Sequence, residues 1–184
     1  MGTRSIIAEP DGHQGWRGRY CHWDGYPQGV GVNLLAIVQR DGIEQARRIL
    51  LHDFYGWSGI NRAQPNIEGV EPDRDAEWGS PAYVAHQFGP DGTSGGGRWV
   101  NVPGYGEAYN PLPGVPENDT VFREFQRDEW MIEDHLDGTW CEWLYIMEDD
   151  HLKVACIVPD PRPLRWFGSF DYDDVNEAIR LAKV

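Results

Sequence analysis

Two β-rich runs separated by a pair of aspartates constrain the fold of this chain more than any other feature. Residues 140–148 and 151–158 carry the aromatic and β-branched residues that favour strands, and Asp149 and Asp150 lie between them. Because side chains alternate between the two faces of a strand, one face of this hairpin is apolar throughout, and the sequence predicts a helix packed on it. The residues of that face are Cys141, Trp143, Tyr145, Met147, Leu152, Val154, Cys156 and Val158.

The C-terminus supplies one candidate for the covering helix. Asp174 and Glu177 have the spacing of a capping box, and the residues after Asp174 are apolar at helical intervals. That apolar stripe consists of Val175, Ala178, Ile179 and Ala182.

Three further helices are predicted upstream. Residues 30–40 are too apolar for a surface element, so this helix is expected to be largely buried. A second helix follows, with Asp41 as N-cap and Glu44 three positions later. A third is expected over residues 118–135.

The N-terminal segment reads as a hairpin. Residues 3–9 and 16–24 favour strands, and residues 10–15 have the composition of a turn. With the helices above, this predicts one α+β domain over residues 1–184, in which helices pack on an antiparallel or mixed sheet. Within it, residues 56–117 are rich in Gly, Pro and aromatic residues and are predicted to form a long irregular insertion.

Composition narrows the classes of partner. The chain of 184 residues has 16 basic and 30 acidic residues, a net charge of −14, which disfavours direct binding of nucleic acid. No apolar run approaches the ~20 residues of a membrane span, so no membrane partner is expected. The three cysteines include no C-x-x-C pair, which fits a reducing cytoplasm.

The segment of residues 20–27 concentrates the side chains capable of chemistry. If it is extended, His22 and Asp24 share a face, and a carboxylate near an imidazole can fix its tautomer and favour its charged form. An even hairpin register would place Arg4 opposite His22, whereas an odd register would turn Arg4 away. Arg17 and Arg19 are expected on the other face, with Cys21.

Several interpretations of this cluster remain open. It can be a structural network in the core, a ligand or partner site, or a catalytic site. A metal site that adds His52, His86 or His151 to His22 and Asp24 is conceivable, but no spacing specifies it, so neither a metal nor a cofactor is predicted. No catalytic residue is assigned.

The sequence also resembles a known group of proteins. Residues 1–5 (Met-Gly-Thr-Arg-Ser), residues 20–26 (Tyr-Cys-His-Trp-Asp-Gly-Tyr) and residues 142–145 (Glu-Trp-Leu-Tyr) are similar to blocks in small uncharacterised proteins of tailed bacteriophages and prophages. The resemblance covers the first forty residues best and the middle of the chain hardly at all. It implies a phage accessory protein in the host cytoplasm that binds a host component, such as a defence enzyme or its nucleotide signal.

These observations lead to one main functional prediction and two alternatives. The main prediction is binding of a small anionic, nucleotide-like ligand, with Arg4 and His22 contacting the anion, Asp24 beside them, and Tyr26 or Trp99 as stacking surfaces. One alternative is an acidic decoy that blocks a basic nucleic-acid-binding protein of the host. The other is a hydrolase that uses His22 and Asp24.

Overall fold

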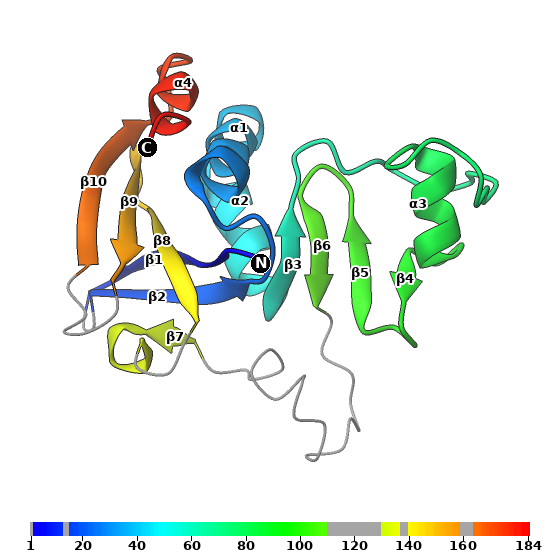
Figure 1. Ribbon diagram of the computed structural model, residues 1–184, viewed down its shortest axis with the longest axis horizontal. Coiled ribbons are helices and arrows are strands. Elements are labelled where there is room, and N and C mark those ends of the chain that lie inside the picture. Colours follow the sequence, from blue (N-terminus) through cyan, green and yellow to red (C-terminus); the bar gives the residue numbers. More distant parts are fainter. Residues whose placement is uncertain (1, 13–14, 110–129, 137–139, 159–163) are drawn as a thin grey trace.

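The computed structural model describes residues 2–12, 15–109, 130–136, 140–158 and 164–184, and it has the predicted α+β architecture (Figure 1). One mixed sheet runs through these residues, in the order β10-β9-β8-β1-β2-β3-β6-β5-β4, and β7 pairs with the first half of β2. Its strands are β1 (Arg4–Asp11), β2 (Gly15–Cys21), β3 (Gly56–Ile60), β4 (Thr93–Ser94), β5 (Trp99–Val102), β6 (Gly106–Tyr109), β7 (Met131–Ile132), β8 (Cys141–Met147), β9 (His151–Ile157) and β10 (Leu164–Asp171).

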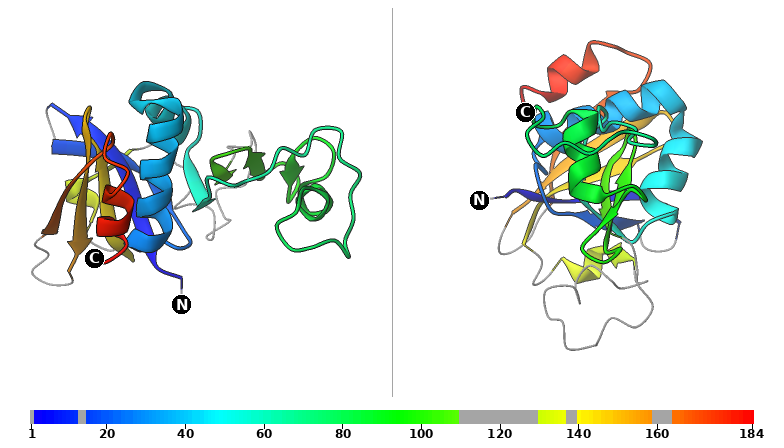
Figure 2. Two further views of the ribbon diagram at one scale, coloured as in Figure 1. Left: turned by 90° about the horizontal axis from the view of Figure 1, so that it is seen from above. Right: turned by 90° about the vertical axis from the view of Figure 1, so that its right-hand side faces the viewer.

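The helices divide between two places along the sheet (Figures 1 and 2). The helical segments are η1 (Pro27–Gly31), α1 (Val32–Asp41), α2 (Ile43–Arg47), η2 (Arg48–His52), α3 (Pro81–Phe88), η3 (Glu133–His135) and α4 (Glu177–Leu181). Residues of η1, α1, α2, η2 and α4 form the main core with one face of β1, β2, β8 and β9. We call this the helix-covered face of the sheet. The helix α3 packs separately, beside β4 and β5.

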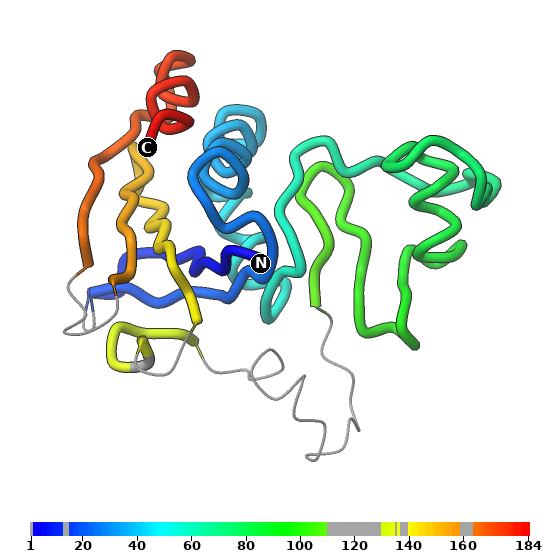
Figure 3. The backbone as a smooth tube through the Cα atoms, viewed as in Figure 1, coloured from blue at the N-terminus to red at the C-terminus, as the bar shows by residue number. Residues whose placement is uncertain are grey.

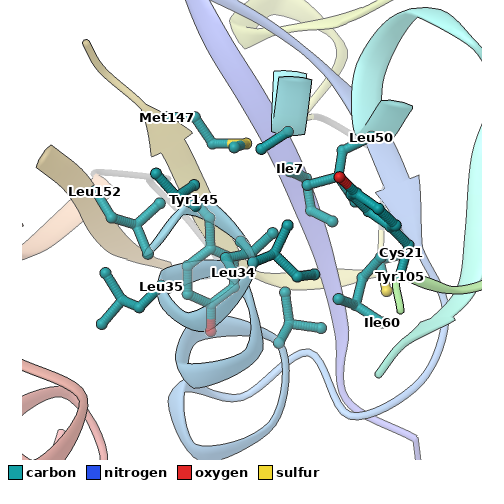
Figure 4. Packing of buried hydrophobic residues seen from close by; sticks show 14 of the residues in the cluster. Ile7, Cys21, Leu34, Leu35, Leu50, Ile60, Tyr105, Tyr145, Met147 and Leu152 are labelled. Carbon is teal, nitrogen blue, oxygen red and sulfur yellow. The ribbon is translucent and has the colours of Figure 1, made fainter. Parts of the chain in front are cut away.

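The hairpin of β8 and β9 has the predicted register. Trp143 pairs with Cys156, Tyr145 with Val154 and Met147 with Leu152. Tyr145, Met147 and Leu152 lie against Leu34 and Leu35 of α1 in the main core (Figure 4), so a helix covers this apolar face as expected. The prediction was wrong for Cys141, which packs with Leu144 and Ile146 on the opposite face, because the pairing of β8 with β1 shifts by one residue at Glu142.

The prediction for the C-terminal helix was only partly right. Leu181 is fully buried and Ala178 packs against the main core, but Val175 and Ile179 are 75% and 59% exposed. A helix as short as α4 covers only the end of the sheet. The longer and more apolar α1 therefore covers most of the face that the C-terminal helix was expected to cover.

The N-terminal hairpin is also present, with Ser5 opposite Cys21 and Ile7 opposite Arg19. Its second strand is shorter than predicted, since β2 ends at Cys21 and not at Asp24. The parallel neighbour of β1 is β8, and that of β2 is β3, so the hairpin lies in the middle of the sheet. Figure 3 shows the path of the chain from this blue hairpin into the green segment.

The glycine-rich middle of the chain is more regular than its composition predicts. Its described part, up to Tyr109, contributes β3, β4, β5, β6 and α3, and β3 and β6 extend the sheet beyond β2. The glycine content was wrongly interpreted as a sign of irregular structure. At Gly56, for example, a Cβ atom would lie 3.2 Å from the Tyr20 carbonyl oxygen, so glycine allows the two strands to pack closely. Glycine in these strands permits close packing and does not mark irregular structure.

Two predicted details of the helices were wrong. The cap of α2 is Gly42, in a left-handed conformation, while Asp41 ends α1 and binds Arg40 and Tyr105. Most of the helix expected over residues 118–135 lies outside the described residues, but Met131 and Ile132 form a strand and not a helix. Pairing with β2 competes successfully with helix propensity at that point.

Candidate functional site

Polar side chains from five neighbouring strands, or from positions next to them, lie in one line across the sheet. They occupy the face opposite the helix-covered face, because their strand neighbours Ser5, Cys21, Trp57 and Ala108 are turned the other way. We call this line the polar row. It consists of Cys141 at the start of β8, Arg4 of β1, His22 directly after β2, Ser58 of β3 and Glu107 of β6.

The first half of the polar row follows from strand register. Arg4 pairs with Cys141 of β8, and the pairing of β1 with β2 ends at Ser5 and Cys21, directly before Arg4 and His22 on the two strands. This is the even register that the sequence left open. Arg4 is also close enough to affect the titration of both Tyr20 and His22.

The second half depends on backbone contacts beyond the end of β2. The amide of His22 donates to the carbonyl oxygen of Trp57 at 3.0 Å, and that of Trp23 donates to Ser58 at 2.9 Å. A bulge in β3 at Ser58 then precedes the pairing of Gly59 with Glu107. The side chains of Ser58 and Glu107 are hydrogen-bonded to each other.

A chain of hydrogen bonds joins Arg4, Tyr20 and His22. Arg4 donates to the hydroxyl of Tyr20, whose oxygen lies 2.9 Å from Nδ1 of His22. A guanidinium only donates, so the Tyr20 oxygen accepts from Arg4, and the same oxygen shares one further proton with Nδ1 of His22.

The surroundings favour the neutral forms of His22, Tyr20 and Glu107. Burial, and then the charge of Arg4, lower the pKa of His22. Burial raises the pKa of Tyr20 well above its ordinary value, although Arg4 opposes this. Further along the row, burial raises the pKa of Glu107, and the hydrogen bond from Ser58 partly offsets the effect.

An exposed aromatic ring lies next to the hydrogen-bonded chain. The ring of Trp23 meets that of His22 edge to face, with centroids 4.4 Å apart, and Trp23 is 48% exposed. Its other neighbour is the backbone at Gly2, where a Cβ atom would lie 2.3 Å from the indole. Trp23 therefore has a fixed position beside His22 and a surface available for stacking.

The predicted pairing of His22 with Asp24 is not the arrangement found. Asp24 has a left-handed backbone with φ of 56°, which ends the alternation of the strand. Its carboxylate accepts a hydrogen bond from the Tyr26 hydroxyl at 3.3 Å, while Nδ1 of His22 bonds to Tyr20. The acid–base pair on which the hydrolase alternative depended is thus replaced by two separate contacts.

The two predicted stacking residues lie in different surroundings. Tyr26 is 39% exposed, in the turn before η1. Trp99 of β5 packs against the small apolar cluster around α3 and pairs with Tyr109 of β6, three strands away from β2 in the sheet. Sequence reasoning missed Trp23 as the aromatic neighbour of His22, because strict strand alternation would have placed it on the opposite face.

A second cluster of charged and aromatic side chains was also missed. On the helix-covered face, the guanidinium groups of Arg17 and Arg19 lie over the ring of Trp130, 4.5 and 4.0 Å from its centroid. Glu9 forms ion pairs with Arg17 and His52. Only the placement of the two arginines with Cys21 was predicted, since no short-range pattern connects Trp130 to this hairpin.

Metal ligands, membrane spans and similarity to known proteins do not identify a function. Within the described ranges, no group of three or more His, Cys, Asp and Glu side chains could hold a metal ion. Among those same residues, no helix is long and apolar enough to cross a membrane. No protein-family model matches the chain, and no curated protein or solved structure matches it significantly. Any functional assignment therefore depends on the geometry and chemistry of the polar row.

Proposed function

We propose that this protein binds a small anionic, nucleotide-like ligand on the polar row, with Arg4 and His22 contacting the anion. The observation that carries the proposal is the hydrogen-bonded chain of Arg4, Tyr20 and His22. Both terminal side chains are partly exposed, and both offer N–H donors. Two donors held in fixed positions suit the oxygens of a phosphate or carboxylate.

The state of the imidazole supports an anion site that does not need a charged histidine. With its pKa lowered, His22 is neutral at pH 7, and a neutral imidazole still keeps one N–H donor. The positive charge of the site then comes from Arg4. Trp23, rather than Tyr26 or Trp99, is the aromatic ring positioned to stack on a base or sugar next to the anion.

The biological setting is part of the same proposal. The resemblance of the N-terminal blocks to phage and prophage proteins supports an accessory protein that acts in the host cytoplasm. A protein that binds a nucleotide-like anion there would sequester a nucleotide signal of host defence. The role proposed is therefore binding rather than catalysis.

Calorimetric titration with nucleotides and cyclic dinucleotides at up to millimolar concentration tests the proposal. We expect saturable binding by the wild-type chain, and a loss of about tenfold or more in affinity for Arg4→Gln and for His22→Gln, because each removes a hydrogen bond to a charged group. Tyr20→Phe should also weaken binding, since it removes the hydroxyl that orients both donors.

Matched substitutions elsewhere provide the controls. Arg74→Gln and His86→Gln remove the same side-chain types from exposed positions away from the polar row, and should leave the affinity unchanged. The proposal fails if no nucleotide gives a binding signal, or if the variants at Arg4 and His22 bind as tightly as these controls.

A further inference from the structure

The polar row continues beyond His22 with groups of opposite hydrogen-bonding character. Arg4 and His22 present donors, whereas the Glu107 carboxylate presents acceptors and is hydrogen-bonded to Ser58. The backbone bonds from His22 and Trp23 to β3, and the pairing of Gly59 with Glu107, fix the relation between the two ends of the row.

The separation of the two ends indicates a ligand larger than a free ion. One strand, β3, lies between the strand that leads into His22 and the strand that carries Glu107. Neighbouring strands are about 4.8 Å apart, so the two backbones are separated by roughly 10 Å, and their side chains extend over the same face. A bare phosphate can occupy one end only.

Resting on the proposed function, we infer that Glu107, oriented by the buried Ser58, binds a hydroxyl group of the same ligand, which makes the ligand class a sugar phosphate. Its phosphate lies at Arg4 and His22, and its sugar extends across β3 toward Glu107. A carboxylate that is partly buried and already hydrogen-bonded is a strong, fixed acceptor for hydroxyl groups. Nucleotides are one kind of sugar phosphate and satisfy the same two requirements.

The bulge in β3 determines the direction of the Ser58 side chain. The bulge adds one residue to β3 opposite β6, and this directs the Ser58 side chain to the same face as Glu107 and Tyr109. Its hydroxyl hydrogen-bonds with both side chains, so it orients the acceptor end of the row.

Titration of the full chain with three small compounds tests the inference. The compounds are inorganic phosphate, methyl phosphate and ribose 5-phosphate, of which only the last carries sugar hydroxyls. We expect ribose 5-phosphate to bind about tenfold more tightly than methyl phosphate, because one hydrogen bond from a sugar hydroxyl to a charged carboxylate contributes about that much affinity. Glu107→Gln should remove this advantage without changing the affinity for methyl phosphate, while Glu71→Gln, at an exposed position, should keep it.

The outcomes separate the inference from the function on which it rests. Equal affinities of the wild-type chain for methyl phosphate and ribose 5-phosphate would overturn the sugar-phosphate inference and leave the anion site intact. The same holds if Glu107→Gln keeps the preference for ribose 5-phosphate. If none of the three compounds and no nucleotide binds, the proposed anion site itself is wrong. The comparison of the two esters uses only wild-type protein, so it does not depend on the folding of a variant.

Discussion

His22 shows how much of a site can follow from one residue and its strand register. Of the two registers that the sequence left open, the hairpin has the even one, and Arg4 is close enough to His22 to lower its pKa. The partner expected for the imidazole was Asp24, yet Tyr20 takes that place. The single left-handed residue at Asp24 decides this difference, and strand periodicity carries no information about it.

The neutral state of His22 predicts a pH dependence of stability. The folded protein lowers the pKa of His22 below the ordinary value of about 6.5, so the unfolded chain binds this proton more readily. The contribution of His22 to the free energy of unfolding should therefore fall as the pH drops below about 6.5. It should level off once the pH is below the folded-state pKa.

Proton NMR of the imidazole ring provides the measurement. The His22 resonance, identified by its absence from the His22→Gln spectrum, should titrate with a midpoint below 6.5. Urea unfolding of the same variant should show a weaker loss of stability between neutral and mildly acid pH than the wild type. A midpoint at or above 6.5 would contradict the assignment of a neutral ring to the folded state.

At the scale of elements, the sequence predicted the two hairpins and the buried α1 because each has a strong local signal of its own. It failed for β7, whose strand character comes from pairing with β2, more than a hundred residues earlier. It also failed for β3, β5 and β6, where glycine and aromatic residues resemble loop composition. In both cases tertiary contact overrides local propensity.

Trp130 directly precedes β7 and should hold that strand onto β2. Its ring is covered by the guanidinium groups of Arg17 and Arg19, and His52 meets it edge to face at 5.3 Å. Each cation–π contact contributes roughly 0.5–1 kcal/mol, and the ring also loses partly buried surface on truncation. We expect Trp130→Ala to lower the free energy of unfolding by about 2 kcal/mol in urea titrations.

A second tryptophan makes the comparison specific. Trp78 is 81% exposed, so Trp78→Ala should change the stability by less than about 0.5 kcal/mol. If both substitutions cost the same, the stacked arrangement around Trp130 does not stabilise the fold.

At the scale of the whole molecule, the order of the strands was the part least accessible to sequence reasoning. The parallel pairing of β1 with β8 joins residues about 140 positions apart, as the register of Arg4 with Cys141 shows. Such pairings carry no short-range pattern, and the two hairpins could be arranged in several ways in a mixed sheet. The polar row could not be predicted for the same reason, because it forms only when β8, β1, β2, β3 and β6 are assembled in this order.

Net charge is the property of the whole molecule that leads to the last prediction. A charge of −14 repels itself more strongly in the compact state than in the expanded unfolded chain. Exposed ion pairs, such as that of Arg48 with Asp53, offset this only slightly. Raising the ionic strength to about 0.15 M shortens the screening length to about 8 Å. Salt should therefore weaken the repulsion between like charges more than it weakens the attraction within ion pairs.

We expect sodium chloride and choline chloride alike to raise the thermal midpoint by roughly 2–4 °C over low-salt buffer at pH 7, a gain of about 1 kcal/mol. The increment should shrink near the isoelectric point, where the net charge vanishes; a midpoint that falls with salt at pH 7 would mean that specific ion pairs outweigh the overall repulsion.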